Sequence, residues 1–137
     1  VPASVGISLT QRKVAESFWV ITGTTSDHKL SKDVQLASKS AATVVILMGM
    51  HKLGEIISIY QENRNDDLPI AIIQNGTKNS EQKVIGTVNT ISKLVSEKKI
   101  SSPAIIVIGE VVRNTSSWIS YFQEHFDDEF IFQNLNL

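Results

Sequence analysis

A chain of 137 residues with 42% hydrophobic residues and a net charge of −1 can bury one ordinary core and has no basic excess for binding nucleic acid. It has no cysteine, which excludes a disulfide framework and favours a cytoplasmic location. Its longest apolar run, around residues 41–50, is far shorter than the roughly 20 residues that cross a bilayer, so we expect no membrane partner.

The first part of the chain predicts a connector, a strand and a short helix. Residues 1–12 mix proline, glycine and serine with small apolar residues, and we interpret them as an interdomain linker. Residues 16–23 are aromatic and β-branched and stop at a glycine, which indicates a strand followed by a loop. Ser31 can cap a helix whose apolar residues, as far as Ala41, share one face.

The continuous apolar run of residues 42–50 is typical of a strand that is buried on both faces of a parallel sheet. We expect this strand to be the centre of the sheet. Ligands of open α/β sheets bind outside the carboxyl ends of the strands. The turn formed by Met48, Gly49 and Met50 is therefore the first place to look for a site.

The rest of the chain continues the alternation of helix and strand. Apolar residues at helical spacing predict helices over about residues 53–63 and 84–95, and the second has room for a short strand at its start. Buried strands are predicted at residues 69–74, which end at an Asn-Gly pair, and at 103–109. A final helix follows Ser116 or Ser117.

These elements predict an α/β fold with about five strands in a mixed, mainly parallel sheet flanked by helices. We place the α/β domain at residues 13–126, after the linker. Residues 127–137 are interpreted as a loose C-terminal tail or an edge strand.

The residues themselves carry little catalytic chemistry. His28, His51 and His125 are scattered without the spacing of a metal site, so we interpret them as ordinary surface or loop histidines and predict no metal. The glycines do not form a phosphate-binding loop. A serine elbow, a cysteine nucleophile and a close carboxylate pair are all missing from the sequence, so a hydrolase mechanism has no support.

Five segments, taken in order and with their spacing, resemble the C-terminal half of the tetrapyrrole methylases. The resemblance covers roughly residues 6–112, and its specificity lies in the ordered set. The segments are residues 9–12 (Leu-Thr-Gln-Arg), 17–23 (Ser-Phe-Trp-Val-Ile-Thr-Gly), 45–49 (Val-Ile-Leu-Met-Gly), 69–77 (Pro-Ile-Ala-Ile-Ile-Gln-Asn-Gly-Thr) and 103–112 (Pro-Ala-Ile-Ile-Val-Ile-Gly-Glu-Val-Val).

The resemblance is strongest to the family members that methylate two pyrrole carbons of uroporphyrinogen III with S-adenosyl-L-methionine. The product, precorrin-2, leads to sirohaem and cobalamin-type cofactors. The resemblance implies a cytoplasmic, two-domain homodimer of which this chain is the second domain. The family's glycine-rich S-adenosylmethionine loop lies in the first domain, so we expect the fragment by itself to be inactive.

The resemblance also assigns the cofactor site. Met48 falls on the family's Met-Gly position, where its backbone and thioether meet the adenosyl group and the substrate lies beside it. Gly76 matches the glycine whose backbone borders the adenine. Ala104 lies where a small residue lets the adenine approach.

Arg12 matches the arginine of the family's T-H-R-G motif, where its guanidinium would bind substrate carboxylates. Gln11 and Lys13 depart from that motif, because they replace its histidine and glycine. Thr24 replaces the family's histidine after Thr-Gly, and it can hydrogen-bond a carboxylate or a pyrrole edge but cannot carry a charge.

Methyl transfer to an electron-rich pyrrole carbon depends mainly on proximity and orientation, which can be worth about 7–11 kcal/mol. No dedicated nucleophile is needed, and the sequence does not identify the group that accepts the ring proton. Two alternatives stay open. One is a sister methylase that acts on a later corrin precursor, and the other is a non-catalytic α/β module for dimerisation or ligand binding.

Overall fold

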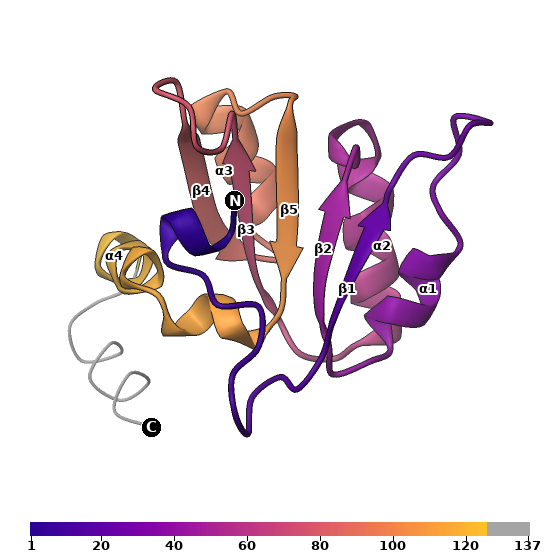
Figure 1. Cartoon of the computed structure of the whole chain (residues 1–137), viewed down its shortest axis with the longest axis horizontal. Coiled ribbons are helices and arrows are strands. Elements are labelled where there is room, and N and C mark those ends of the chain that lie inside the picture. The colour runs from indigo at the N-terminus through magenta and orange to yellow at the C-terminus, as the bar shows by residue number, and fades with distance from the viewer. Residues whose placement is uncertain (126–137) are drawn as a thin grey trace.

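The computed structural model describes residues 1–125, which form one five-stranded sheet in the order β1-β2-β5-β3-β4 (Figure 1). The strands are β1 (Phe18–Thr22), β2 (Thr43–Leu47), β3 (Pro69–Gln74), β4 (Gln82–Thr87) and β5 (Ala104–Ile108). The helices are α1 (Asp33–Ser38), α2 (Leu53–Asn63), α3 (Ile91–Lys98) and α4 (Ser116–His125). Short 3-10 turns lie at Ala3–Val5, Met50–Lys52 and Glu110–Asn114.

The prediction of a mixed sheet of about five strands flanked by helices is confirmed, but the prediction that it is mainly parallel is wrong. Only β1 and β2 pair in parallel within the described sheet. β5 runs antiparallel to both of its neighbours, β2 and β3, and β3 and β4 pair as an antiparallel hairpin. A buried strand has a continuous apolar sequence whichever way its neighbours run, so the sequence pattern could not distinguish the two arrangements.

We expected the strand formed by the apolar run at residues 42–50, which is β2, to be the centre of the sheet. This prediction is wrong, because β5 occupies the centre. β5 follows β4 in sequence, yet it is inserted between β2 and β3. The order of strands depends on contacts between residues that are far apart in sequence, and local periodicity carries no information about such contacts.

A row of apolar side chains crosses the whole sheet and forms the middle of the core. Its members are paired from strand to strand and are at most 6% exposed: Ile21, Ile46, Ile106, Ile72 and Val84. Burial of each such side chain contributes about 1.5–3 kcal/mol before the entropy of ordering is subtracted. The row therefore stabilises this register of the five strands.

Three of the predicted helices lie close to their expected positions, and one of them, α4, begins at Ser116. α2 spans Leu53–Asn63 as predicted, and α1 begins just after Ser31, whose hydroxyl accepts a hydrogen bond from the Asp33 amide at 3.3 Å. The helix predicted from residue 84 begins only at Ile91, because residues 82–87 form all of β4. β-Branched residues at positions 84 and 85 pair with β3, where they pack better than in a helix.

Helices α2 and α3 and the N-terminal segment cover opposite faces of the sheet. In the view of Figure 1, α2 and α3 lie behind the sheet, and the N-terminal segment crosses in front of β3. Ile7 of this segment is buried in the core, at 2% exposure. Whether residues 1–12 link two domains stays a prediction. The tail at residues 127–137 and the last residue of the proposed domain lie outside the described residues.

None of the helices within residues 1–125 has both the length and the apolar character needed to cross a membrane.

Candidate functional site

Several chain segments meet at one end of the sheet, which we call the open end. β1, β2 and β3 run in the same direction and finish there, and β5 begins there (Figure 1). The open end therefore comprises the turns after the first three strands and the start of β5 with the residues just before it. It contains Thr24, Met48, Gly76 and Ala104, four of the five predicted site residues.

Met48 is held outward at the open end by its backbone. Its φ is +55°, a left-handed conformation that residues other than glycine seldom adopt, and its side chain is 67% exposed. The Thr24 hydroxyl donates a hydrogen bond to the Met48 carbonyl oxygen at 2.7 Å. A strained residue held by its neighbours is a common feature of ligand sites.

Gly49, the next residue in this turn, packs closely against the core. A Cβ at Gly49 would lie 2.7 Å from Ile46 Cγ2, closer than packed carbon atoms approach, and would make a tight contact of 3.3 Å with Ile56 Cδ1. The packing at this turn therefore favours a residue without a side chain at position 49. Met48 and Gly49 are neighbours in sequence, but one faces outward and the other packs against the core.

The first of two adjoining hollows at the open end has a volume of about 320 Å³. Met48, Gly76 and Ala104 all line it, although they come from three separate segments. The side chain of Val1 lies directly against Gly76, so a Cβ at that position would collide with it. The Asn75 amide donates to the Pro103 carbonyl oxygen at 3.0 Å and ties the turn after β3 to the start of β5.

The second hollow, of about 280 Å³, continues from the first beyond Met48 and Ala104. It is also lined by Thr24, Met50, His51, Ser102 and Pro103. Together the two hollows form a trough whose walls are largely aliphatic and are broken by backbone polar groups. Such a surface suits a flat ligand with an apolar face and polar edges, such as an adenosyl group.

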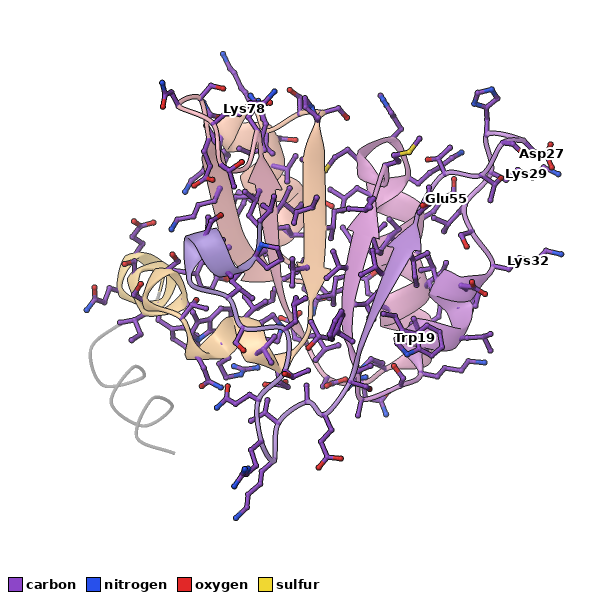
Figure 2. The ribbon with its side chains drawn as sticks, in the orientation of Figure 1. Trp19, Asp27, Lys29, Lys32, Glu55 and Lys78 are labelled. Carbon is purple, nitrogen blue, oxygen red and sulfur yellow. The ribbon has the colours of Figure 1, made fainter. Side chains whose placement is uncertain are left out.

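Two ionisable side chains, Lys78 and His51, line the trough among the described residues. Lys78 borders the first hollow, and Figure 2 shows it on the turn that joins β3 to β4. His51 borders the second hollow. Sequence reasoning treated His51 as an ordinary histidine and did not consider Lys78. Each lies within three residues of a predicted site residue, which is the signal that could have identified them.

The structure does not bring Arg12 to the open end. Its neighbour Gln11 bridges to Ala15 and accepts a hydrogen bond from Asn114 Nδ2 at 2.8 Å. Asn114 follows β5, whose carboxyl end is at the opposite end of the sheet. Arg12 thus lies far along the strands from Met48 and Thr24, and its role in substrate binding stays a prediction.

The opposite end, which we call the closed end, is held by ion pairs. Arg64 forms two hydrogen bonds with Asp66, at 2.8 and 2.9 Å, and donates to the Ser40 carbonyl oxygen at 2.7 Å. The hydrogen bond from Arg64 lowers the pKa of Asp66 below its usual value. Glu110 pairs with Arg113 at 2.9 Å.

Within residues 1–125, histidine, aspartate and glutamate side chains do not gather in any group of three that could hold a metal ion.

Comparison with known proteins gives a consistent family of relatives. The family model of the tetrapyrrole (corrin/porphyrin) methylases matches residues 1–92. The uroporphyrinogen-III C-methyltransferase of Methanocaldococcus jannaschii is 39% identical over 114 residues, which are 82% of this chain and 47% of the relative. Siroheme synthase 1 of Klebsiella pneumoniae is 35% identical over 112 residues, which are 81% of this chain and 23% of the relative.

A solved structure shares the fold. It is the uroporphyrin-III C-methyl transferase from Thermus thermophilus complexed with S-adenyl homocysteine, which superposes with a TM-score of 0.69 at 22% identity. The superposition covers 81% of this chain and 49% of that one. The chain thus spans about half the length of the curated C-methyltransferases that it matches.

Proposed function

Because this chain belongs to the tetrapyrrole methylase family, we propose that it is the C-terminal domain of an S-adenosylmethionine-dependent methyltransferase. The proposed reaction converts uroporphyrinogen III to precorrin-2, the branch point toward sirohaem and cobalamin-type cofactors. The observation that carries the proposal is the convergence of Met48, Gly76 and Ala104 on one hollow. The sequence matches to the family independently assign these three residues to one site.

We propose that the first hollow holds the adenosyl part of the methyl donor. S-adenosylmethionine supplies the methyl group when it is bound. Gly76 adds no side chain to the wall of the hollow, and Ala104 adds only a methyl group. Met48 projects its thioether over the same hollow, where its flexible side chain can pack against the ligand.

The substrate would lie beside the donor, over the second hollow. Met48 and Ala104 border both hollows, so a ligand in one would contact a ligand in the other. The residues would then act by holding the two reactants in line and by excluding water between them. In the reaction a pyrrole carbon bonds to the methyl carbon as the sulfur–methyl bond breaks, and the ring later loses a proton. Arg12, at the closed end, is proposed as a substrate-binding residue only through the family resemblance.

The proposed enzyme needs a further domain. The matched methyltransferases are about twice as long as this chain, so we propose that their additional half supplies the rest of the site and that this domain alone does not methylate. We further propose a cytoplasmic homodimer, which the family resemblance favours.

The test is mass spectrometry of the product formed anaerobically from uroporphyrinogen III and S-adenosylmethionine by the complete protein that contains this chain. We expect a gain of two methyl groups. No methylation by the folded, complete protein would contradict the assignment. A product only from a later corrin precursor would favour a sister methylase, and binding without turnover would favour a non-catalytic module.

A matched pair of variants tests the role of Met48. Met48→Ala should weaken binding of S-adenosylhomocysteine by about tenfold, measured by calorimetry, because it removes a side chain from the hollow wall. Leu36→Ala removes a similarly exposed apolar side chain from α1, at 61% exposure, and should leave binding unchanged. If both variants bind S-adenosylhomocysteine with the same affinity, Met48 is not part of the cofactor site.

A further inference from the structure

His51 stands at the mouth of the second hollow. It belongs to the 3-10 turn Met50–Lys52, which directly follows the Met48–Gly49 turn, and it lines the hollow together with Thr24 and Ser102. Its side chain is exposed, and no hydrogen bond or ion pair engages the imidazole within the described part of the chain. A histidine that served packing would be buried or bonded, so this one is free to meet a ligand.

Thr24 cannot donate a hydrogen bond to a ligand in the same hollow. A threonine hydroxyl has one proton, and that of Thr24 is directed to the Met48 carbonyl oxygen at 2.7 Å. The Thr24 hydroxyl oxygen can still accept a hydrogen bond. A carboxylate group can also only accept, so the two cannot bond to each other. The position that was expected to contact substrate carboxylates is therefore unable to hydrogen-bond them without losing the bond that holds Met48.

The nearest charged neighbour in sequence is also engaged. Lys52 pairs with Glu55 at 3.4 Å, and its side chain is 26% exposed. Asp27 and Lys29 lie on the loop after β1, which Figure 2 shows projecting away from β3. Among the described residues that line the second hollow, His51 alone can carry a positive charge, and Ser102 contributes a hydroxyl that has no hydrogen-bond partner within residues 1–125.

We propose that His51 binds a carboxylate group on the rim of the substrate and so supplies the hydrogen-bond donor that Thr24 cannot. An imidazole has at least one N–H in either protonation state, and its exposed position lets it reach outward over the hollow. Hydrogen bonds to charged groups are among the stronger ones in proteins. This inference rests on the proposed function, because it takes the substrate to be a tetrapyrrole with a carboxylate rim.

The experiment uses the complete protein and measures two affinities separately. Uroporphyrin III, the stable oxidised form of the proposed substrate, is titrated by fluorescence quenching, and S-adenosylhomocysteine is titrated by calorimetry. His51→Ala should weaken uroporphyrin binding by about tenfold and leave S-adenosylhomocysteine binding within about twofold. His51→Arg should restore most of the porphyrin affinity, because a guanidinium also donates to carboxylates.

A second histidine in the chain provides the control. His28 is exposed on the loop after β1 and has a φ of +59°, which asparagine tolerates, so His28→Asn should leave both affinities unchanged. A porphyrin whose acetate groups are replaced by methyl groups should show a smaller loss on His51→Ala, because fewer carboxylates remain at the rim.

The outcomes separate this inference from the proposed function. Wild-type protein that neither binds uroporphyrin nor methylates uroporphyrinogen would overturn both. Wild-type protein that methylates, with unchanged porphyrin affinity in His51→Ala, would overturn the inference alone. An equal loss of both affinities in His51→Ala would show a structural role and would also overturn it.

Discussion

The two ends of the sheet are built from the same strands but satisfy their polar groups differently. At the closed end, Arg64 joins Asp66 and the Ser40 carbonyl, and Arg113 pairs with Glu110 while its guanidinium lies 5.0 Å from the ring centre of Trp118. At the open end, an exposed methionine in a left-handed conformation borders two hollows.

The difference indicates that the closed end mainly stabilises the fold and that the open end is available for binding. Charges that are paired within the chain stabilise the fold but have little capacity left to bind a ligand. The open end keeps unpaired groups and a strained turn, which cost stability unless a ligand or another domain contacts them. Substitutions at the closed end should therefore change stability, and those at the open end should change binding, except where the open end packs on the core.

Gly49→Ala should have the largest effect and marks that exception. The added Cβ would approach Ile46 Cγ2 to 2.7 Å, so we expect the free energy of unfolding to fall by about 1–3 kcal/mol in urea denaturation. Gly54→Ala is the matched control, because a Cβ there has nothing within 4 Å and lies in helix α2. It should leave stability unchanged or raise it by up to about 1 kcal/mol. Equal effects of the two variants would contradict the packing argument.

Arg64→Ala should lower the free energy of unfolding by about 1–2 kcal/mol, because it removes the contacts to Asp66 and to the Ser40 carbonyl oxygen. Binding of S-adenosylhomocysteine should not change. Lys93→Ala breaks a pair with Glu97 that is longer, at 3.9 Å, and far more exposed, so it should have no measurable effect on stability. If Arg64→Ala weakens binding of S-adenosylhomocysteine without lowering stability, the proposed difference between the two ends is wrong.

Thr24→Val should lower stability by about 1 kcal/mol or less, because it removes one partly exposed hydrogen bond. Its larger consequence should be a severalfold weaker affinity for S-adenosylhomocysteine, since the Met48 turn loses its restraint. Thr25→Val changes an exposed neighbouring threonine and serves as the control. If calorimetry finds the same affinity in both variants, the Thr24 hydroxyl does not position Met48.

Asp66→Asn should have the smallest effect and one that depends on pH. Because the pKa of Asp66 is lowered in the folded protein, its pairing contributes stability above the ordinary aspartate pKa of about 3.9 and loses it as pH falls through the lowered value. The side chain is 48% exposed and screened by solvent, so the contribution at pH 7 should be below about 1 kcal/mol. Unfolding measured at pH 7 and pH 3 should show a smaller difference from wild type at pH 3 than at pH 7. A difference of the same size at both pH values would point to another cause.

Local sequence patterns predicted much of the fold. The apolar runs located four of the strands, helical spacing located α2, and glycine or asparagine marked the turns at Gly49 and Gly76. Patterns of this kind are local, because the period of burial follows from the geometry of a single strand or helix. The ordered motifs also identified the family and, with it, three residues that the structure places on one hollow.

Only the tertiary structure decided how these pieces meet. The insertion of β5 between β2 and β3 made the sheet mostly antiparallel and brought Ala104, at the start of a strand, beside residues at the ends of others. The tertiary structure also places Arg12 away from the open end. Within residues 1–125 the Thr24 hydroxyl is hydrogen-bonded, whereas the His51 imidazole is not. These facts depend on pairings between residues distant in the chain and on the direction of single hydrogen bonds, and neither leaves a periodic trace in the sequence.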